Sequence, residues 1–250
     1  MTALRELVCG EVRGSGRFAK SLKHLGDTLV LLNASLRMPL SVDHPAHRLV
    51  VPFFARSLVE VACTILIGRL DSFRLLTLAE MQSQGTYNPA IKLASAIQWS
   101  GDVLTPDGAV RRMWDAATRP TDMSRALLGD YNEHVTWRPG FTALLDYFSQ
   151  LPSTQTIGPW SEALRNIGPP GFLPSLRGQM TALYSTASKG VHHEFVLSFP
   201  AYFDDATLDQ LSEDALRFVA TLAVVVNFVE HVAFALTPNR AFDCFEELQK

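Results

Sequence analysis

The chain has 250 residues, of which 47% are hydrophobic and 19% are charged, and its formal net charge is −3 at pH 7. This length suffices for one large domain or two small ones, and the apolar fraction is ample for a buried core. The slightly negative charge argues against sequence-independent binding along a nucleic-acid backbone, which usually requires a basic surface. We expect a soluble globular protein with a single domain over residues 1–250.

The three cysteines, Cys9, Cys63 and Cys244, lie far apart in the sequence and form no CxxC pair. They indicate neither a zinc ribbon nor a disulfide framework, and they fit a reducing compartment. The amino terminus carries charged residues where a secretory signal would be apolar. These features predict a cytoplasmic protein that does not span a membrane.

The first half of the chain has the pattern of helices separated by proline, glycine and capping residues. Between residue 16 and Pro39, apolar residues recur at alternating steps of four and three, which predicts a long amphipathic helix. A second long helix is expected over residues 44–70, with a kink at Pro52. Shorter helices are expected over residues 71–84, 88–99 and 141–148.

Residues 151–174 are rich in proline and glycine and predict a long loop around one short helical turn. We expect this loop to be ordered, because its aromatic and aliphatic residues can pack against the core. The chain then returns to a helical pattern over residues 174–190. Residues 239–250 have the spacing of a short amphipathic helix.

The final long helix is expected over residues 207–236. Its uninterrupted apolar stretch, residues 218–226, is too short to span a bilayer and is typical of a buried core helix. No segment alternates convincingly as a β-strand would. The sequence therefore predicts an all-α protein, a multi-helix bundle with residues 44–70, 174–190 and 207–236 at its centre.

A polar stripe runs beside the apolar face of the helix that contains residues 176–192. In a functional interpretation, His192 donates or accepts a proton, and Ser185, Ser188 and Lys189 form an anion cradle. In the alternative interpretation, the stripe is a solvated helix edge, and His192 caps the last carbonyl groups. The sequence leaves both interpretations open.

Arg56 and Glu60 lie one turn apart within an apolar stripe of the second helix. A charged pair is costly to bury without partners, so this pair should face a polar pocket or the polar groups of another helix. Arg56, oriented by Glu60, would suit a phosphate clamp. The simpler alternative is an internal ion pair that holds helices together.

Neighbouring histidines and acids occur at residues 192–194 and 230–231. Adjacent residues on a helix point about 100° apart, so they do not easily share one ion. No HExxH spacing, glycine-rich phosphate loop or GxSxG motif is present. We therefore expect no metal site and no cofactor.

Two motifs, FFARSLVEVACTIL and LYSTASKGVHHEF, resemble those of the HEPN-like group of prokaryotic helical domains. The likeness is to a branch with an RSLLE-like helix followed later by an LYxxLSxxVH-like helix. The resemblance implies a helical bundle that forms a homodimer and, for many members, a link to RNA cleavage, toxin–antitoxin pairs or phage defence. The matching residues are Arg56, Ser57, Leu58, Glu60, Leu183, Tyr184, Ser185, Ser188, Val191 and His192.

If the protein is catalytic, the resemblance implies metal-independent cleavage of RNA. His192 would then act as acid or base, and Arg56 or Lys189 would stabilise the phosphate charge. Glu60, Ser185, Ser188 and Tyr184 would complete the binding site.

The sequence departs from the active members at a decisive point. Those members carry an arginine and, a few residues later, a histidine on one helix, whereas only Lys189 precedes His192 at short range. Arg17 and His24 on the first long helix form a second candidate pair. The alternative function is a non-catalytic binding or interaction module, in which the polar cluster is structural and residues 151–174 present a surface to a protein partner.

Overall fold

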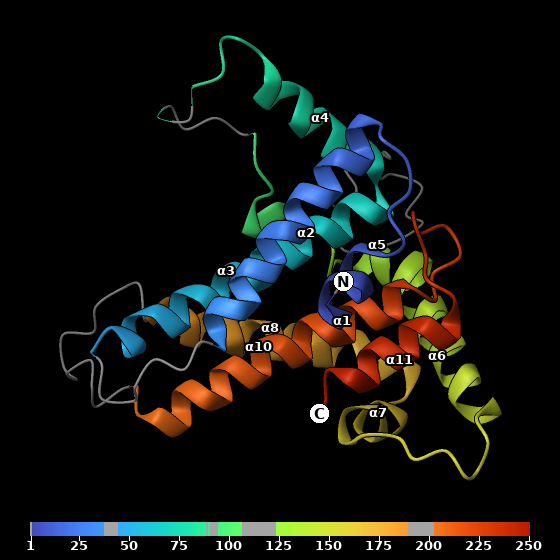
Figure 1. The fold of residues 1–250 in the computed structure, drawn as a ribbon. Helices are drawn as coiled ribbons and strands as arrows, with labels where there is room; N and C mark the ends of the chain where they lie inside the picture. The colour runs from blue at the N-terminus through green and yellow to red at the C-terminus, as the bar shows by residue number, and fades with distance from the viewer. Residues whose placement is uncertain (1, 38–44, 89, 91–94, 107–123, 190–202) are drawn as a thin grey trace.

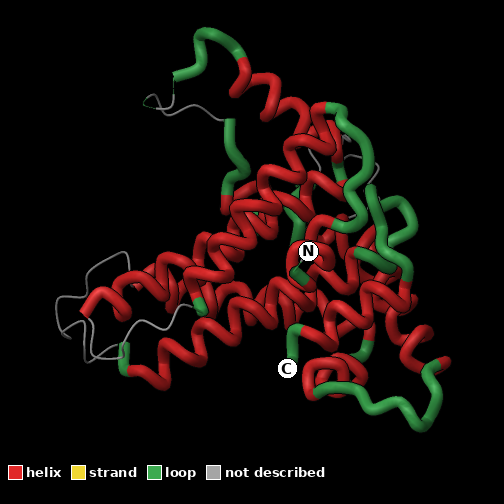
Figure 2. The backbone as a smooth tube through the Cα atoms, viewed as in Figure 1, coloured by secondary structure: helices red, strands yellow, loops and turns green. Residues whose placement is uncertain are grey.

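The structure is a computed structural model that describes residues 2–37, 45–88, 90, 95–106, 124–189 and 203–250. The regular elements in these ranges are all helices (Figure 1, Figure 2), which confirms the predicted all-α class. The long helices are α2 (Arg17–Leu36), α3 (Pro45–Leu70), α8 (Pro169–Lys189) and α10 (Asp205–Val226). The shorter elements are α1 (Ala3–Cys9), α4 (Ser72–Ser83), η1 (Trp99–Val103), α5 (Asp130–Asn132), η3 (Glu133–Trp137), α6 (Arg138–Gln150), α7 (Pro159–Arg165) and α11 (Pro238–Glu247).

Helix α3 is the central element, and it packs against α2, α8 and α10 (Figure 1). Its stretch Val50–Leu70 is long and apolar enough to cross a membrane, but 56% of that stretch is buried inside the protein. This burial is what a core helix of a soluble protein shows. Its boundaries agree with the prediction, and Pro52 lies within the helix. The side chains of Ala55, Leu58, Ala62, Cys63, Ile65 and Leu66 have no exposed surface.

Helix α10 begins at Asp205, two residues before the predicted start, and ends at Val226, ten residues before the predicted end at Leu236. The side chain of Asp204 caps its first turn by accepting a hydrogen bond from the Thr207 amide at 2.8 Å. Every residue from Phe218 to Val226 is buried, as expected for a core helix. The chain then turns at Asn227 instead of continuing as helix.

A buried arginine holds the turn that follows α10. Arg69, at the end of α3, is only 1% exposed. Its guanidinium bonds the carbonyl groups of residues 233 and 234, so it holds the segment after α10 against the end of α3. Desolvation lowers the pKa of Arg69 to about 10. The acceptors of its hydrogen bonds are Leu7 O at 3.4 Å, Val8 O at 3.0 Å, Ala233 O at 2.9 Å, Phe234 O at 3.3 Å and Asn227 Oδ1 at 2.9 Å.

Part of the loop predicted over residues 151–174 is helical. Helix α7 is the short helical turn expected within this loop. Helix α8, however, begins at Pro169, five residues before its expected start. Prolines suit the first turn of a helix, because the amide groups there need no helical partner. The apolar residues of this region do pack, as expected: Trp160, Leu164, Phe172 and Leu173 are buried.

The helix predicted over residues 88–99 is not found in the part of it that the structure describes. Residues 95–98 are a loop that leads into η1, and the rest lies largely outside the described residues. Tertiary contacts hold this loop. The side-chain amide of Gln82 on α4 donates to the carbonyl of Ser95 at 2.7 Å, and Trp99 stacks on Tyr184 of α8.

Candidate functional site

Arg56 and Glu60 form the predicted pair on α3, and Tyr184 of α8 joins them. Arg56 Nε donates to Glu60 Oε1 at 2.9 Å, and Arg56 Nη2 donates to the Tyr184 hydroxyl at 2.5 Å. The two charged side chains are 25% and 43% exposed. The pair therefore meets a polar group of another helix, which is one of the two environments that a charged pair in an apolar stripe requires.

Aromatic stacking completes this group of residues, which we call the Arg56 cluster: Arg56, Glu60, Trp99 and Tyr184. The Arg56 guanidinium carbon lies 4.5 Å from the centroid of the Tyr184 ring. The Tyr184 ring also stacks on Trp99, with the centroids 3.8 Å apart and the planes inclined by 18°. Contacts of these kinds each contribute roughly 0.5–2 kcal/mol. The cluster thus ties α3, α8 and η1 together.

The geometry of the Arg56 cluster favours the structural interpretation over the phosphate clamp. Two of the three guanidinium nitrogens of Arg56 already donate within the cluster, and only Nη1 bonds no described residue. Glu60 and Tyr184 thus occupy the edge of the guanidinium formed by Nε and Nη2, and a phosphate could take that edge only by displacing one of them. The cluster is therefore best described as an interhelical tie.

The other residues predicted for this site are dispersed along α8. Ser185 is exposed, whereas the Ser188 hydroxyl oxygen is buried without a hydrogen-bond partner. Lys189 is half-buried at the C-terminal end of the helix. His192 lies outside the described residues, so the structure does not place the predicted acid–base group. Of the site residues predicted from the sequence, the structure brings together only Arg56, Glu60 and Tyr184, with Arg56 bonded to each of the other two.

A groove of about 620 Å³ lies beside the Arg56 cluster, between α2, α3, α4 and the loop at residues 96–97. Glu60 belongs to the Arg56 cluster and also lines the groove. The floor is apolar and comes from four segments of the chain. It is formed by Leu25, Val61, Leu75, Leu78, Ala79 and Ile97.

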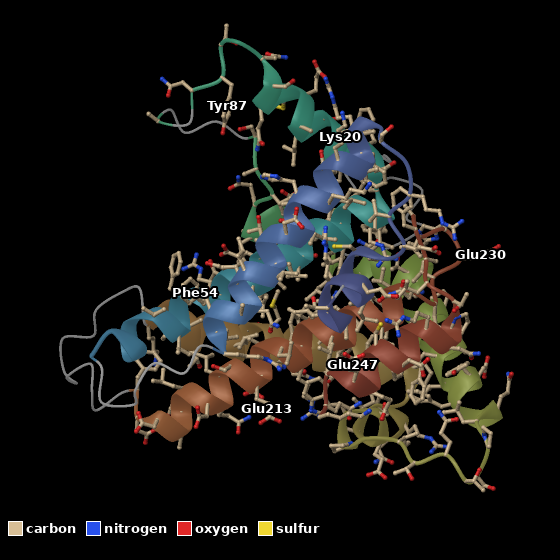
Figure 3. All side chains as sticks on the ribbon, viewed as in Figure 1. Lys20, Phe54, Tyr87, Glu213, Glu230 and Glu247 are labelled. Carbon is tan, nitrogen blue, oxygen red and sulfur yellow. The ribbon has the colours of Figure 1, made fainter. Side chains whose placement is uncertain are left out.

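Three polar side chains on the walls of the groove have unused hydrogen-bonding capacity. Lys20 and His24 lie one turn apart on α2, and Figure 3 labels Lys20 close to α4. Neither the Lys20 ammonium nor the His24 ring bonds a described residue, and Glu60 uses only Oε1, toward Arg56. An apolar cavity with a few convergent polar groups is the usual composition of a ligand site.

The structure separates the second candidate pair, Arg17 and His24. His24 lines the groove, whereas Arg17 forms an exposed ion pair with Glu80 of α4 and does not line it. The Arg17–Glu80 pair links α2 to α4, the two helices that flank the groove. Arg17 thus joins the two helices but does not line the groove.

Sequence reasoning missed the groove and Trp99. The groove is assembled from side chains of three helices and a loop, and no single segment carries its pattern. A usable signal was the spacing of Lys20 and His24, which places both on one helical face next to apolar Leu25. Trp99 gave no signal, because its partner Tyr184 lies far away in the sequence.

The cysteines offer no nucleophile. All three are free and buried. Burial raises the pKa of Cys63 to about 12 and the pKa values of Cys9 and Cys244 to about 11, so the reactive thiolate form is rare at neutral pH. Among the described residues, no group of three or more His, Cys, Asp or Glu side chains is arranged to hold a metal ion.

Comparison of the chain with protein-family models, with curated proteins and with solved structures finds no match. The resemblance to HEPN-like proteins therefore remains a hypothesis that depends on two short motifs. Those motifs do meet in space, since Arg56 of the first bonds Tyr184 of the second. Function must be argued from the geometry of the groove and of the Arg56 cluster.

Proposed function

We propose that this protein is a non-catalytic helical binding protein, and that the groove between α2, α3 and α4 holds a small amphipathic ligand. The observation that carries the proposal is the cavity of about 620 Å³ with its apolar floor and three polar wall groups. Cavities of roughly 300–1,000 Å³ with this composition are typical ligand sites.

The wall groups define the chemistry of the ligand. Lys20 is a cation and His24 a hydrogen-bonding ring on the α2 wall, so they suit an anionic or carbonyl group of the ligand. Glu60 on the α3 wall suits a hydrogen-bond donor. Arg56 fixes Glu60 through Oε1 at 2.9 Å, and this pre-organisation lowers the entropy lost on binding. The ligand body lies on the apolar floor.

8-Anilinonaphthalene-1-sulfonate (ANS) is a suitable probe, because it combines an aromatic body with one anionic group. We expect saturable fluorescence enhancement with one site per chain. Lys20→Glu should raise the dissociation constant at least about tenfold, equivalent to about 1.4 kcal/mol. Lys23→Glu is the matched control: it makes the same charge change on the same helix, but Lys23 bonds Gly14 O and does not line the groove. Equal affinities for the two variants would contradict the proposal.

A second candidate function uses the same groove for metal-independent RNA cleavage. The observation that favours it is the presence of His24, Lys20 and Glu60 in one cavity. Glu60 would accept the proton of the ribose 2′-hydroxyl as this oxygen attacks the phosphorus, and His24 would donate a proton to the leaving 5′-oxygen, which gives a 2′,3′-cyclic phosphate. Lys20 would stabilise the phosphate charge. In this form, the RNA chemistry implied by the HEPN-like resemblance would depend on His24 instead of His192.

Incubation with mixed RNA in EDTA separates the two candidates. Cleavage by the wild type that is lost only in His24→Ala would assign a nuclease to the groove. Cleavage that is lost only in His192→Ala would assign it to the region after α8. Intact RNA in every reaction, together with Lys20-dependent ANS binding, would support the binding protein.

A further inference from the structure

A second cavity, of about 660 Å³, lies between α8 and α10 and shares no lining residue with the groove. Its apolar lining consists of the exposed Ala182 and Ala206 and of Leu183, Leu211 and Phe218, which are 7%, 3% and 1% exposed. Two charged residues of α10, Asp214 and Arg217, also line it. The cavity therefore combines an apolar surface with both signs of charge.

Asp214 and Arg217 form no ion pair with each other. They lie three residues apart on α10, a spacing that brings side chains onto neighbouring turns with Cβ atoms about 5–6 Å apart. Asp214 Oδ1 instead accepts a hydrogen bond from the Gln210 side chain at 2.9 Å. Arg217 is half-buried and bonds no described residue. A partly desolvated guanidinium without a partner is unfavourable, so this site favours an anionic ligand group.

A second anionic group in the ligand would be disfavoured. Asp204 also lines the cavity, where it caps α10 by bonding the Thr207 amide, and Asp214 keeps one carboxylate oxygen without a described partner. A ligand with a carboxylate alone would meet Arg217 but would face the Asp214 carboxylate. A ligand with an adjacent ammonium group would satisfy Asp214 as well.

We propose that this cavity binds a free α-amino acid with an apolar side chain. Its carboxylate forms a paired hydrogen bond with the Arg217 guanidinium, and its ammonium group bonds Asp214. The single α-carbon that carries both charged groups matches the one-turn spacing of the two residues. The apolar side chain lies against Leu183, Leu211 and Phe218. Figure 1 shows α8 and α10 running beside each other along this part of the molecule.

Isothermal titration of the full chain with L-leucine and L-phenylalanine tests the proposal. We expect one saturable site for at least one of them. L-leucine methyl ester lacks the carboxylate charge, and N-acetyl-L-leucine lacks the ammonium, so each should bind at least about tenfold more weakly than L-leucine. The same comparison is made with the derivatives of phenylalanine if phenylalanine binds better.

Two variants test which residues bind the charged groups of the amino acid. Arg217→Gln and the exposed Asp214→Asn should each weaken binding of the amino acid at least about tenfold. Arg165→Gln is the matched control, because Arg165 is an exposed arginine on α7 that lines none of the described cavities. Thermal melting checks that each variant is folded. If Arg217→Gln does not fold, the binding affinity of Asp214→Asn alone decides the outcome.

Three results would overturn the proposal. The first is the absence of saturable binding with both amino acids. The second is equal affinity for the ester or the acetylated derivative. The third is an affinity that Asp214→Asn leaves unchanged. Lys20→Glu should leave binding of the amino acid unchanged, so failure of the proposed groove function is distinguishable from failure here.

Discussion

Replacement of Arg69 by methionine tests its role in holding the turn after α10. Methionine retains most of the apolar stem but removes every donor of the guanidinium. Arg69 joins the end of α3 to α1 and to the turn after α10 through its hydrogen bonds to Val8 O, Ala233 O and Asn227 Oδ1. Loss of these donors should loosen the whole junction.

The expected loss of stability follows from the acceptors that remain. Asn227 Oδ1 keeps the Leu236 amide, and Leu7 O keeps the Asn227 side-chain amide. Phe234 O keeps the Glu11 amide. Only two carbonyls, those of residues 8 and 233, lose their described side-chain donor. The bond to the first is buried and the bond to the second is partly buried, and a fully buried carbonyl left unpaired costs about 1–3 kcal/mol. Removal of a desolvated cation offsets part of this sum, so we expect a net loss of about 2–4 kcal/mol.

Urea unfolding, followed by circular dichroism, measures this loss as a lower midpoint at an unchanged slope. Arg69→Lys retains the charge but not the planar fork and should give an intermediate loss. Arg165→Met, at an exposed position, should change the free energy of unfolding by no more than about 0.5 kcal/mol. A value for Arg69→Met within that same range would refute the role assigned to Arg69.

Three further predictions concern other contacts. Gly10→Ala should destabilise the protein by about 2 kcal/mol or more in urea unfolding, because Gly10 has a φ of 71° and an added Cβ would lie 1.9 Å from a carbonyl oxygen; an unchanged midpoint would contradict this. Tyr184→Phe removes the hydrogen-bond acceptor of Arg56 and should cost about 1 kcal/mol, whereas Tyr184→Ala also removes the stack and should cost about 3 kcal/mol or more; equal losses would be inconsistent with the cluster. The Arg240 hydrogen bonds lower the pKa of Glu6, so this carboxylate stabilises the fold above its unfolded pKa near 4.3 and loses that contribution as the pH falls through its folded pKa. Glu6→Gln should therefore reduce the fall in the free energy of unfolding below about pH 4.5. An unchanged fall would argue against a contribution of the Glu6–Arg240 pair.

The sequence predicts those parts of the fold that depend on local pattern. The periodic apolar residues of α2 and α3 define these helices well, and the apolar centre of α10 correctly indicates a buried core helix. The end of α10 could not be predicted in this way, because the apolar spacing continues to Leu236. The turn that replaces the rest of this helix is held by a tertiary contact with Arg69, which lies more than a hundred residues earlier.

The same distinction holds for the candidate sites. The i,i+4 spacing of Arg56 and Glu60 predicts their contact, and the need for a polar partner anticipates Tyr184. The groove and the cavity between α8 and α10 depend on how separate helices pack, which the one-dimensional pattern does not contain. His192 lies outside the described residues, so its predicted role as acid or base stays a prediction.

The most direct test of the groove as the ligand site is the proton NMR signal of the His24 ring during titration with ANS. His24→Gln assigns this signal, and the exposed His134 and His231 serve as internal references. His231 is a useful one because it lines a different cavity, of about 250 Å³. We predict that the His24 signal shifts in a saturable manner, and that its half-maximal shift occurs at the same ANS concentration as the midpoint of the fluorescence titration. The signals of the two reference histidines should not shift. An unmoved His24 signal during saturating ANS binding would contradict the proposed site.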